Sequence, residues 1–196
     1  MLAAAGTTEG RVLDLAVGTG YYLAGVLDQS PHTVGACLDL SRHALRRAAA
    51  SHPRAAALGA DVRRPLPLRR GSFDVALSVF GPRDPREIRR VLRGTGRLIV
   101  VSPTSAHLSE LVATLNLIGV DPDKTTRQQQ AFADFDPVHV EHLGYQRNLT
   151  SDEVQAVVGM GPTGVHLSSE TIARRASQLP NPTTTTISVN ISTYAP

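Results

Sequence analysis

The first hundred residues alternate between short apolar stretches and amphipathic stretches of about ten residues, which limits the folds available to the chain. Helices are predicted from the GTG turn to about Gln29, from an N-cap at Ser41 to about His52, and over 84–93. Such alternation is typical of βαβ units, so we expect a doubly wound α/β fold with a mostly parallel sheet covered on both faces. The expected strands are RVLDL (11–15), TVGACLDL (33–40), AAALGAD (55–61), FDVALSVF (73–80) and RLIVVSP (97–103).

The pattern changes after Pro103. The sequence predicts an amphipathic helix over 105–119, a loop or insertion over 120–142, and a strand over 143–150. A helix over 151–160, begun by Ser151 or Asp152, a polar linker over 180–186 and a final strand over 186–194 complete the prediction. We therefore expect a single domain over residues 1–196, with a core at 11–103 and a variable part at 104–196.

Composition excludes several classes of protein. The chain has 196 residues, of which 41% are hydrophobic, and this is enough for one well-buried domain. No apolar stretch approaches the roughly 20 residues that span a bilayer, and MLAAAGTTEGR does not have the pattern of a secretory signal. A single cysteine, Cys37, excludes an internal disulfide and a cysteine-built metal site. We expect a cytoplasmic protein with no bound metal and no membrane partner.

The basic residues are almost all arginines. The net charge is +3, Lys124 is the only lysine, and fourteen arginines lie between Arg42 and Arg97. Because the planar guanidinium suits phosphate recognition, this distribution favours a nucleic-acid partner. A solvated surface in an arginine-rich chain explains it equally well, and the sequence leaves both interpretations open.

Three predicted strands end in residues suited to holding a cofactor. The first leads through Asp14 into a turn with Gly18, Thr19 and Gly20. The second ends at Asp39 and Leu40, and the third at Asp61 and Val62. Open α/β sheets bind ligands beyond the carboxyl ends of their strands, so these groups are expected to lie together.

The turn does not fit a dinucleotide. The GxGxxG fingerprint fails, because Tyr21, Tyr22 and Leu23 follow Gly20. A cofactor with a nucleoside at one end and a zwitterionic amino acid at the other fits better. Asp39 would accept from both ribose hydroxyls and Asp61 from an adenine amino group, while the Val62 backbone contacts the ring edge. The alternatives are structural: turn glycines, a helix cap at Asp39 and an exposed loop acid at Asp61.

The order of these acids and glycines resembles that of Rossmann-like S-adenosylmethionine-dependent methyltransferases, from about Arg11 to Pro103. The resemblance implies a seven-stranded, mostly parallel sheet with an antiparallel C-terminal strand, and S-adenosylmethionine as the cofactor. One departure is Ala16, where the family's turn usually has glycine. A methyl group there is tolerated at negative φ and is costly otherwise.

Further segments resemble a narrower family, the 23S rRNA guanine-N1 methyltransferases, some of which confer macrolide resistance. They are GTGYYLAGVLD (18–28), GACLDLSRHALRRAAASHP (35–53), SVFGP (78–82), SPTSAHLSEL (102–111) and GMGPTGVHL (159–167). The resemblance implies methyl transfer to guanine N1 and ribosomal RNA as the partner. A homodimer is possible, and the sequence leaves the oligomeric state open.

Within this resemblance, Gly18, Thr19 and His107 contact the cofactor, and Phe80, Gly81 and Pro82 line the mouth where the base enters. Glu110 lies three residues after His107 on the same predicted helix face, which makes it a conceivable proton acceptor. His107 could equally be an ordinary residue at a helix start, Phe80 a core residue and Glu110 a surface acid. No residue is assigned as the general base.

Two features of the narrower family are absent from the sequence: an N-terminal zinc-binding module and a following helical segment whose tyrosine helps to close over the cofactor. Two other functions therefore stay open. One is a small-molecule methyltransferase that uses 120–142 as a lid. The other is a cofactor-binding or vestigial domain that works only with a partner.

Overall fold

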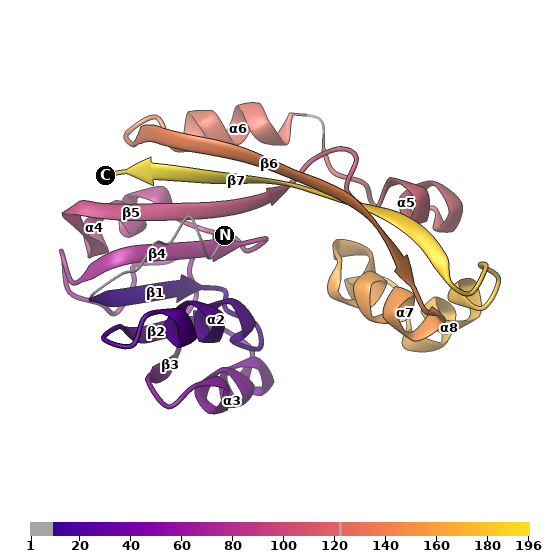
Figure 1. The fold of residues 1–196 in the computed structure, drawn as a ribbon, viewed down its shortest axis with the longest axis horizontal. Coiled ribbons are helices and arrows are strands. Elements are labelled where there is room, and N and C mark those ends of the chain that lie inside the picture. Colours follow the sequence, from indigo (N-terminus) through magenta and orange to yellow (C-terminus); the bar gives the residue numbers. More distant parts are fainter. Residues whose placement is uncertain (1–9, 122) are drawn as a thin grey trace. The chain divides into compact units, whose positions relative to one another are not determined.

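A computed structural model describes residues 10–121 and 123–196. The prediction about the N-terminal segment falls outside these residues, apart from its last two positions. Seven strands form one sheet in the order β3-β2-β1-β4-β5-β7-β6. The pairings β3–β2, β2–β1, β1–β4 and β4–β5 are parallel, and β7 runs opposite to β5 (Figure 1). The expected doubly wound sheet with an antiparallel C-terminal strand is confirmed.

The chain divides into two compact units. The first holds the described residues of Met1–Ser102, Thr126–Glu141 and Asn190–Pro196, and the second those of Pro103–Thr125 and His142–Val189. Strands β6 (Asp136–Leu149) and β7 (Thr183–Ala195) contribute residues to both. Each unit has its own cluster of buried side chains.

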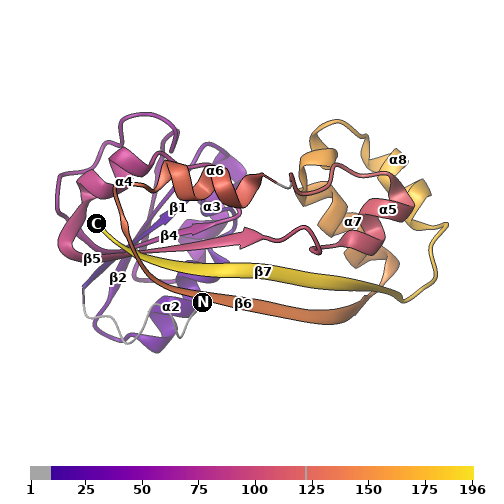
Figure 2. The same cartoon turned by 90° about the horizontal axis from the view of Figure 1, so that it is seen from above.

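The first unit contains the five predicted strands and the helices between them. The strands are β1 (Arg11–Leu15), β2 (Val34–Asp39), β3 (Ala55–Gly59), β4 (Phe73–Val79) and β5 (Leu92–Pro103). The helices are α2 (Tyr21–Gln29), α3 (Arg42–Ser51), α4 (Pro85–Val91) and α6 (Lys124–Ala131). Helices α4 and α6 lie on one face of the sheet and α2 on the other (Figure 2).

Alternation along the strands explains the first core. Leu13 and Leu15 of β1 are fully buried and pack in one cluster with Leu38, Leu98 and Val100. Each such side chain contributes about 2 kcal/mol through burial. Helix α3 begins at the predicted N-cap, since the Ser41 hydroxyl accepts a hydrogen bond from the Ala44 amide. Because neighbouring strands from β3 to β5 are parallel, their C-terminal ends and the loops that follow them lie along one edge of the sheet.

The second unit contains α5 (Ser109–Leu115), α7 (Ser151–Met160), a short 3-10 helix (Pro162–Val165) and α8 (Ser169–Ala176). Its core is formed by Leu111, Leu115, Leu149, Val154, Val158, Ile172 and Ala176. Helix α7 is capped by Thr150 and not by Ser151 or Asp152. The Thr150 side chain and Glu153 form a reciprocal capping box, which satisfies two amides at the helix start.

Several predictions for the C-terminal third are wrong. The segment 120–142 is not a loop: it holds α6 and the first half of β6, whose 14 residues are exposed except for Leu149. Helix α5 is shorter than 105–119 because Leu108 and Asn116 adopt left-handed backbone conformations at its two ends. Helix α8 was not predicted. Strand β7 begins at Thr183, inside the expected linker.

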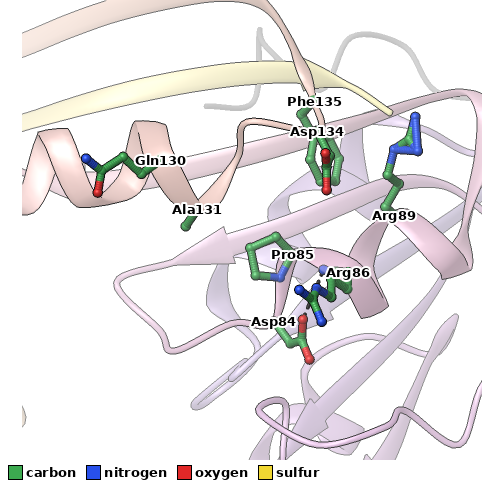
Figure 3. A pocket seen from close by; sticks show the side chains of 8 residues that line it. All are labelled: Asp84, Pro85, Arg86, Arg89, Gln130, Ala131, Asp134 and Phe135. Atoms are coloured by element: carbon green, nitrogen blue, oxygen red, sulfur yellow. Dashed lines mark hydrogen bonds between the residues drawn. The ribbon is translucent and has the colours of Figure 1, made fainter.

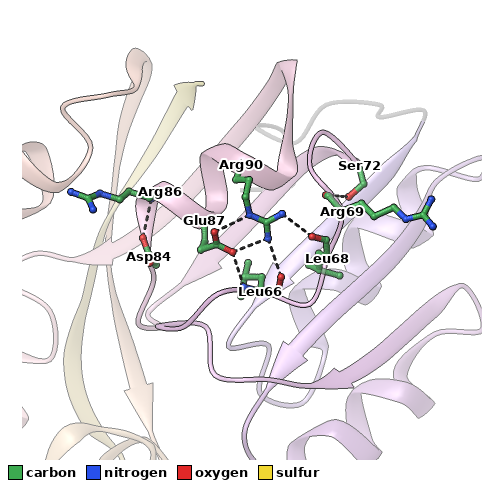
Figure 4. Close-up of polar contacts among 8 residues, drawn as sticks. All are labelled: Leu66, Leu68, Arg69, Ser72, Asp84, Arg86, Glu87 and Arg90. Carbon is green, nitrogen blue, oxygen red and sulfur yellow. Dashed lines mark hydrogen bonds and ion pairs between the residues drawn. The ribbon is translucent and has the colours of Figure 1, made fainter.

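Half of the arginines in the basic region have structural partners. The Arg54 guanidinium donates to the carbonyl oxygens of Leu27, Ser30 and Thr33 and so ties the end of α2 to β2 and β3. Arg90 pairs with Glu87 at 2.7 Å and donates to the carbonyls of Leu66 and Leu68, fastening the 62–72 loop to α4 (Figure 4). Among the described residues of this region, 42–97, seven guanidinium groups have no ion-pair or hydrogen-bond partner: Arg42, Arg46, Arg47, Arg69, Arg70, Arg86 and Arg89.

Candidate functional site

The carboxylate of Asp39 organises the turn after β1. Its Oδ2 accepts the Gly18 amide at 3.0 Å, and its Oδ1 accepts the Ser41 amide at 2.8 Å. The Val17 amide also donates to the Leu38 carbonyl at 3.0 Å, so the turn is held against the end of β2. A carboxylate has about four lone-pair sites, so Asp39 retains acceptor capacity for a diol.

The two glycines of the turn have different roles. Gly20 has φ +85°, and a Cβ there would lie 2.9 Å from the Ala48 Cα, so glycine is needed for the close approach of α2 and α3. Gly18 has φ +58°, and a Cβ there would have no described heavy atom within 4 Å. Gly20 is therefore a packing glycine, whereas Gly18 borders open space in which a ligand can approach the backbone.

Asp14 is a buried acid with an unsatisfied oxygen. The residue is 2% exposed, and among the described residues its Oδ2 has no hydrogen-bond partner. Burial, and then the nearby Asp39, raise the pKa of Asp14 to about 8. Burial and the same two acids raise the pKa of Cys37, the neighbour of Asp14 on β2, to about 11. This end of β1 and β2 is thus a desolvated, acidic environment that favours a cation.

Ala16 occupies the conformation that its methyl group disfavours, with φ +55°. Phe80, at the end of the adjacent strand β4, is also left-handed with φ +56°. A Cβ at position 81 would lie 2.7 Å from the Ala16 Cβ, so Gly81 leaves the room that this methyl group occupies. Non-glycine residues in this region cost about 1–2 kcal/mol each and cluster at functional sites.

Asp61 has a strong local partner. Arg63 donates to its two carboxylate oxygens at 3.0 Å each, and Arg64 lies 3.8 Å away. The Arg63 contacts lower the pKa of Asp61. Asp61 lies at the predicted edge, with Val62 buried beside it, but its carboxylate could contact an adenine amino group only through its remaining lone pairs or after Arg63 moves.

Large apolar side chains are exposed at the same edge. Leu40 after β2 is 63% exposed, and Phe80 after β4 is 48% exposed. Tyr21, in the first turn of α2, is 77% exposed and makes an edge contact with Tyr22. Sequence reasoning did not single out Tyr21, although the YY pair directly after GTG was a signal. Thr19 and Pro82 are also exposed here.

His107 and Glu110 lie in the second unit. The Ser188 amide donates to His107 Nδ1 at 3.2 Å. The Glu110 carboxylate accepts from the Thr186 amide at 2.9 Å, the Thr186 hydroxyl at 2.6 Å and the Thr185 hydroxyl at 3.2 Å. These bonds lower the pKa of Glu110 to about 2, which disfavours it as a proton acceptor. The predicted roles of both residues toward cofactor and base stay predictions.

The described residues contain no group of three or more His, Cys, Asp or Glu side chains placed to hold a metal ion. They do fit a cofactor with a zwitterionic amino-acid end, which carries an ammonium group, and a nucleoside. The unsatisfied Asp14 oxygen suits an ammonium group, the open side of Gly18 suits close backbone approach, and Asp39 suits ribose hydroxyls.

Residues 12–100 match the protein family described as Methyltransferase domain. Over 186 residues the chain is 43% identical to a putative 23S rRNA (guanine-N(1)-)-methyltransferase of Micromonospora griseorubida and to the 23S rRNA (guanine(748)-N(1))-methyltransferase of Streptomyces fradiae. These alignments cover 94% of this chain but 63% and 66% of the relatives, so the chain spans less than two thirds of the length of either.

Solved structures share the fold. A SAM-dependent methyltransferase from Aquifex aeolicus superposes with a TM-score of 0.60 at 12% identity, covering 100% of this chain and 87% of that one. The sheet order, together with the family match over residues 12–100, makes the fold similar to that of the Rossmann-like, S-adenosylmethionine-dependent methyltransferase class. Within that class, its sequence is related over 94% of its length to the 23S rRNA guanine-N1 methyltransferases.

Proposed function

We propose that the chain binds S-adenosylmethionine at the carboxyl edge of β1, β2 and β3 and methylates N1 of a guanine in 23S rRNA. The observation that carries the proposal is the buried, unsatisfied Asp14 oxygen near an acceptor, Asp39, and an open glycine, Gly18. The substrate is proposed from the two relatives that share 43% identity. Such a substrate implies a cytoplasmic enzyme.

Each residue has a role that its local structure supports. Asp14 would hold the ammonium group of the methionine end, and the backbone at Gly18 and Thr19 would lie along it. Asp39 would accept from the ribose hydroxyls, with Leu40 beside the sugar. Asp61 and Val62 would contact the adenine, with the Arg63 pair as a competitor. When bound, the cofactor supplies an activated methyl group on a sulfonium.

The rest of the mechanism is alignment and access. Methyl transfer from a sulfonium to guanine N1 breaks the S–CH3 bond, leaves a thioether and releases the N1 proton to water, so the protein contributes mainly by positioning the two reactants. A guanine paired in a helix must leave its stack, which costs a few kcal/mol. Phe80 offers an exposed ring on which the displaced base can stack. The backbone of Phe80, next to Gly81 and Pro82, is in a strained left-handed conformation. Stacking on such a ring contributes about 1–3 kcal/mol per base.

The direct test is an rRNA methylation assay with the purified chain and with Asp39→Ala. The substrate is unmodified 23S rRNA, and N1-methylguanine is quantified by mass spectrometry. Asp39→Ala should weaken cofactor binding by about 1–3 kcal/mol because ribose hydroxyls lose their acceptor. Methylation by the parent chain and its loss at limiting cofactor in the variant are the expected results. Cofactor binding without any N1-methylguanine would contradict the proposed substrate.

A further inference from the structure

A cavity of about 330 Å³ lies within the first unit, between α4 and α6. Its volume falls at the small end of the range for ligand sites, about the size class of one nucleotide. Figure 3 shows that its walls come from the start of α4, the end of α6 and the turn after α6. The lining residues are Asp84, Pro85, Arg86, Arg89, Gln130, Ala131, Asp134 and Phe135.

Two arginines on one face of α4 give this cavity its cationic side. Arg86 and Arg89 are one helical turn apart, both are exposed, and among the described residues neither guanidinium has an ion-pair partner. In contrast, Arg90 on the same helix is fully engaged by Glu87 and the 62–72 loop (Figure 4). Unengaged guanidinium groups on a rigid helix suit the planar, bidentate binding of phosphate.

Two of the other lining residues, Asp134 and Gln130, suit a base, whereas the Asp84 carboxylate is the N-cap of α4 and accepts the Arg86 amide at 2.9 Å. Asp134 is exposed and has no hydrogen-bond partner among the described residues, and Gln130 on α6 carries an amide in the same wall. A carboxylate accepts from the N–H groups of a guanine, adenine or cytosine edge, whereas it repels a phosphate. Pro85 and Phe135 add apolar surface. The lining thus combines phosphate donors with base-edge acceptors, which a plain basic patch does not.

The cavity adjoins the candidate site along the chain. Phe80, at the proposed mouth for the target base, is five residues before Pro85. Five residues span at most about 18 Å, so both features can contact one RNA strand. We propose that the cavity between α4 and α6 binds a nucleotide that flanks the target guanine, with Arg86 and Arg89 on its phosphate and Asp134 on its base. This inference rests on the proposed RNA substrate.

The test measures binding of a labelled hairpin of 23S rRNA sequence to the full chain by fluorescence anisotropy over a range of salt concentrations. Arg86→Ala/Arg89→Ala should weaken binding about tenfold or more and reduce the salt slope by about 1, because phosphate contacts are lost. Arg46→Ala/Arg47→Ala removes the same charge from exposed positions of α3 and should change both quantities little. Equal effects of the two double variants, or none from the first, would overturn the inference.

The Asp134→Ala variant distinguishes a nucleotide-binding site from a plain basic surface, because the two predict opposite changes in RNA affinity. Loss of an acid from a basic surface should tighten RNA binding, whereas loss of a base-edge acceptor should weaken it several-fold without changing the salt slope. We expect weakening, and tighter binding would overturn the inference. Titration with S-adenosylmethionine shows that each variant keeps its cofactor site. If the parent chain itself does not bind the hairpin, the proposed substrate and this inference both fail. If the parent binds the hairpin and the cavity variants bind it equally well, the inference alone fails.

Discussion

At the residue scale, Asp14 connects stability with binding. Its pKa of about 8 lies above the ordinary value of 3.8, so the folded chain holds a proton that the unfolded chain has released. This group has no effect on stability below pH 3.8, and it lowers stability as the pH rises from there to about 8. A cationic cofactor would instead favour the ionised carboxylate.

Asp14→Asn should therefore stabilise the cofactor-free chain, by up to about 5 kcal/mol at pH 8 and by little near pH 4. The same change should weaken S-adenosylmethionine binding by about 1.5–3 kcal/mol, because a charged partner is lost. Denaturant unfolding at the two pH values and calorimetric titration from pH 6 to pH 8 check both effects. Cofactor affinity should rise with pH in the parent only. A variant that binds as tightly as the parent would show that Asp14 does not meet the cation.

Ala16 and Gly81 form a second residue-scale pair. Ala16→Gly should stabilise the chain by about 1 kcal/mol, because glycine adopts φ +55° without strain. Ala24→Gly in the interior of α2 is the control and should destabilise by about 1 kcal/mol.

Gly81→Ala should be destabilising in the parent, since its Cβ would lie 2.7 Å from that of Ala16, and less so in an Ala16→Gly background. Unfolding free energies of the four chains complete this cycle. Additive effects would show that the methyl group at position 16 does not restrict position 81.

At the element scale, Glu110 ties α5 to β7. Its pKa of about 2 lies below the ordinary 4.5 because Thr186 and Thr185 donate to the carboxylate. This stabilisation is fully present above pH 4.5 and is lost as the pH falls toward 2. Glu110→Gln should lower the free energy of unfolding by roughly 1–2 kcal/mol at pH 7, after screening by solvent, and by less at pH 3.5.

Glu170→Gln is a matched control, because Glu170 is an exposed acid of α8 in the same unit. Denaturant unfolding at the two pH values measures the difference. A Glu110→Gln effect no larger than that of the control would show that the Thr186 contacts do not stabilise α5 on β7. A loss of methylation with unchanged stability would instead support the proton-acceptor role.

Sequence predicts best the elements whose buried side chains leave a clear apolar pattern in the chain. Strands β1, β2 and β4 are buried runs between helices, and their bounds agree with the prediction within two residues. Helix α6, KTTRQQQA, has no apolar stripe, and β6 is exposed on both faces. The sequence therefore predicts a loop for α6 and for the first half of β6, whereas it predicts a strand for the second half of β6, at 143–150.

At the scale of the whole molecule, the order of the strands in the parallel sheet determines which residues at their carboxyl ends lie close together. Asp14, Gly18 and Asp39 come together because β1 and β2 are adjacent and parallel. Sequence could not predict the left-handed backbone at Ala16 or the pairing of Arg63 with Asp61, since both depend on local backbone geometry. It also could not separate structural arginines such as Arg90 from the unengaged Arg86 and Arg89.

The turn after β1 is the proposed cofactor site on which every other assigned role depends. Calorimetric titration of the purified chain with S-adenosylmethionine tests it most directly, with Gly18→Val as the matched variant. A side chain at Gly18 fills the open space beside the backbone and is strained at φ +58°. We expect micromolar binding by the parent and none by a folded Gly18→Val chain. No binding by a folded parent, or equal binding by both, would contradict it.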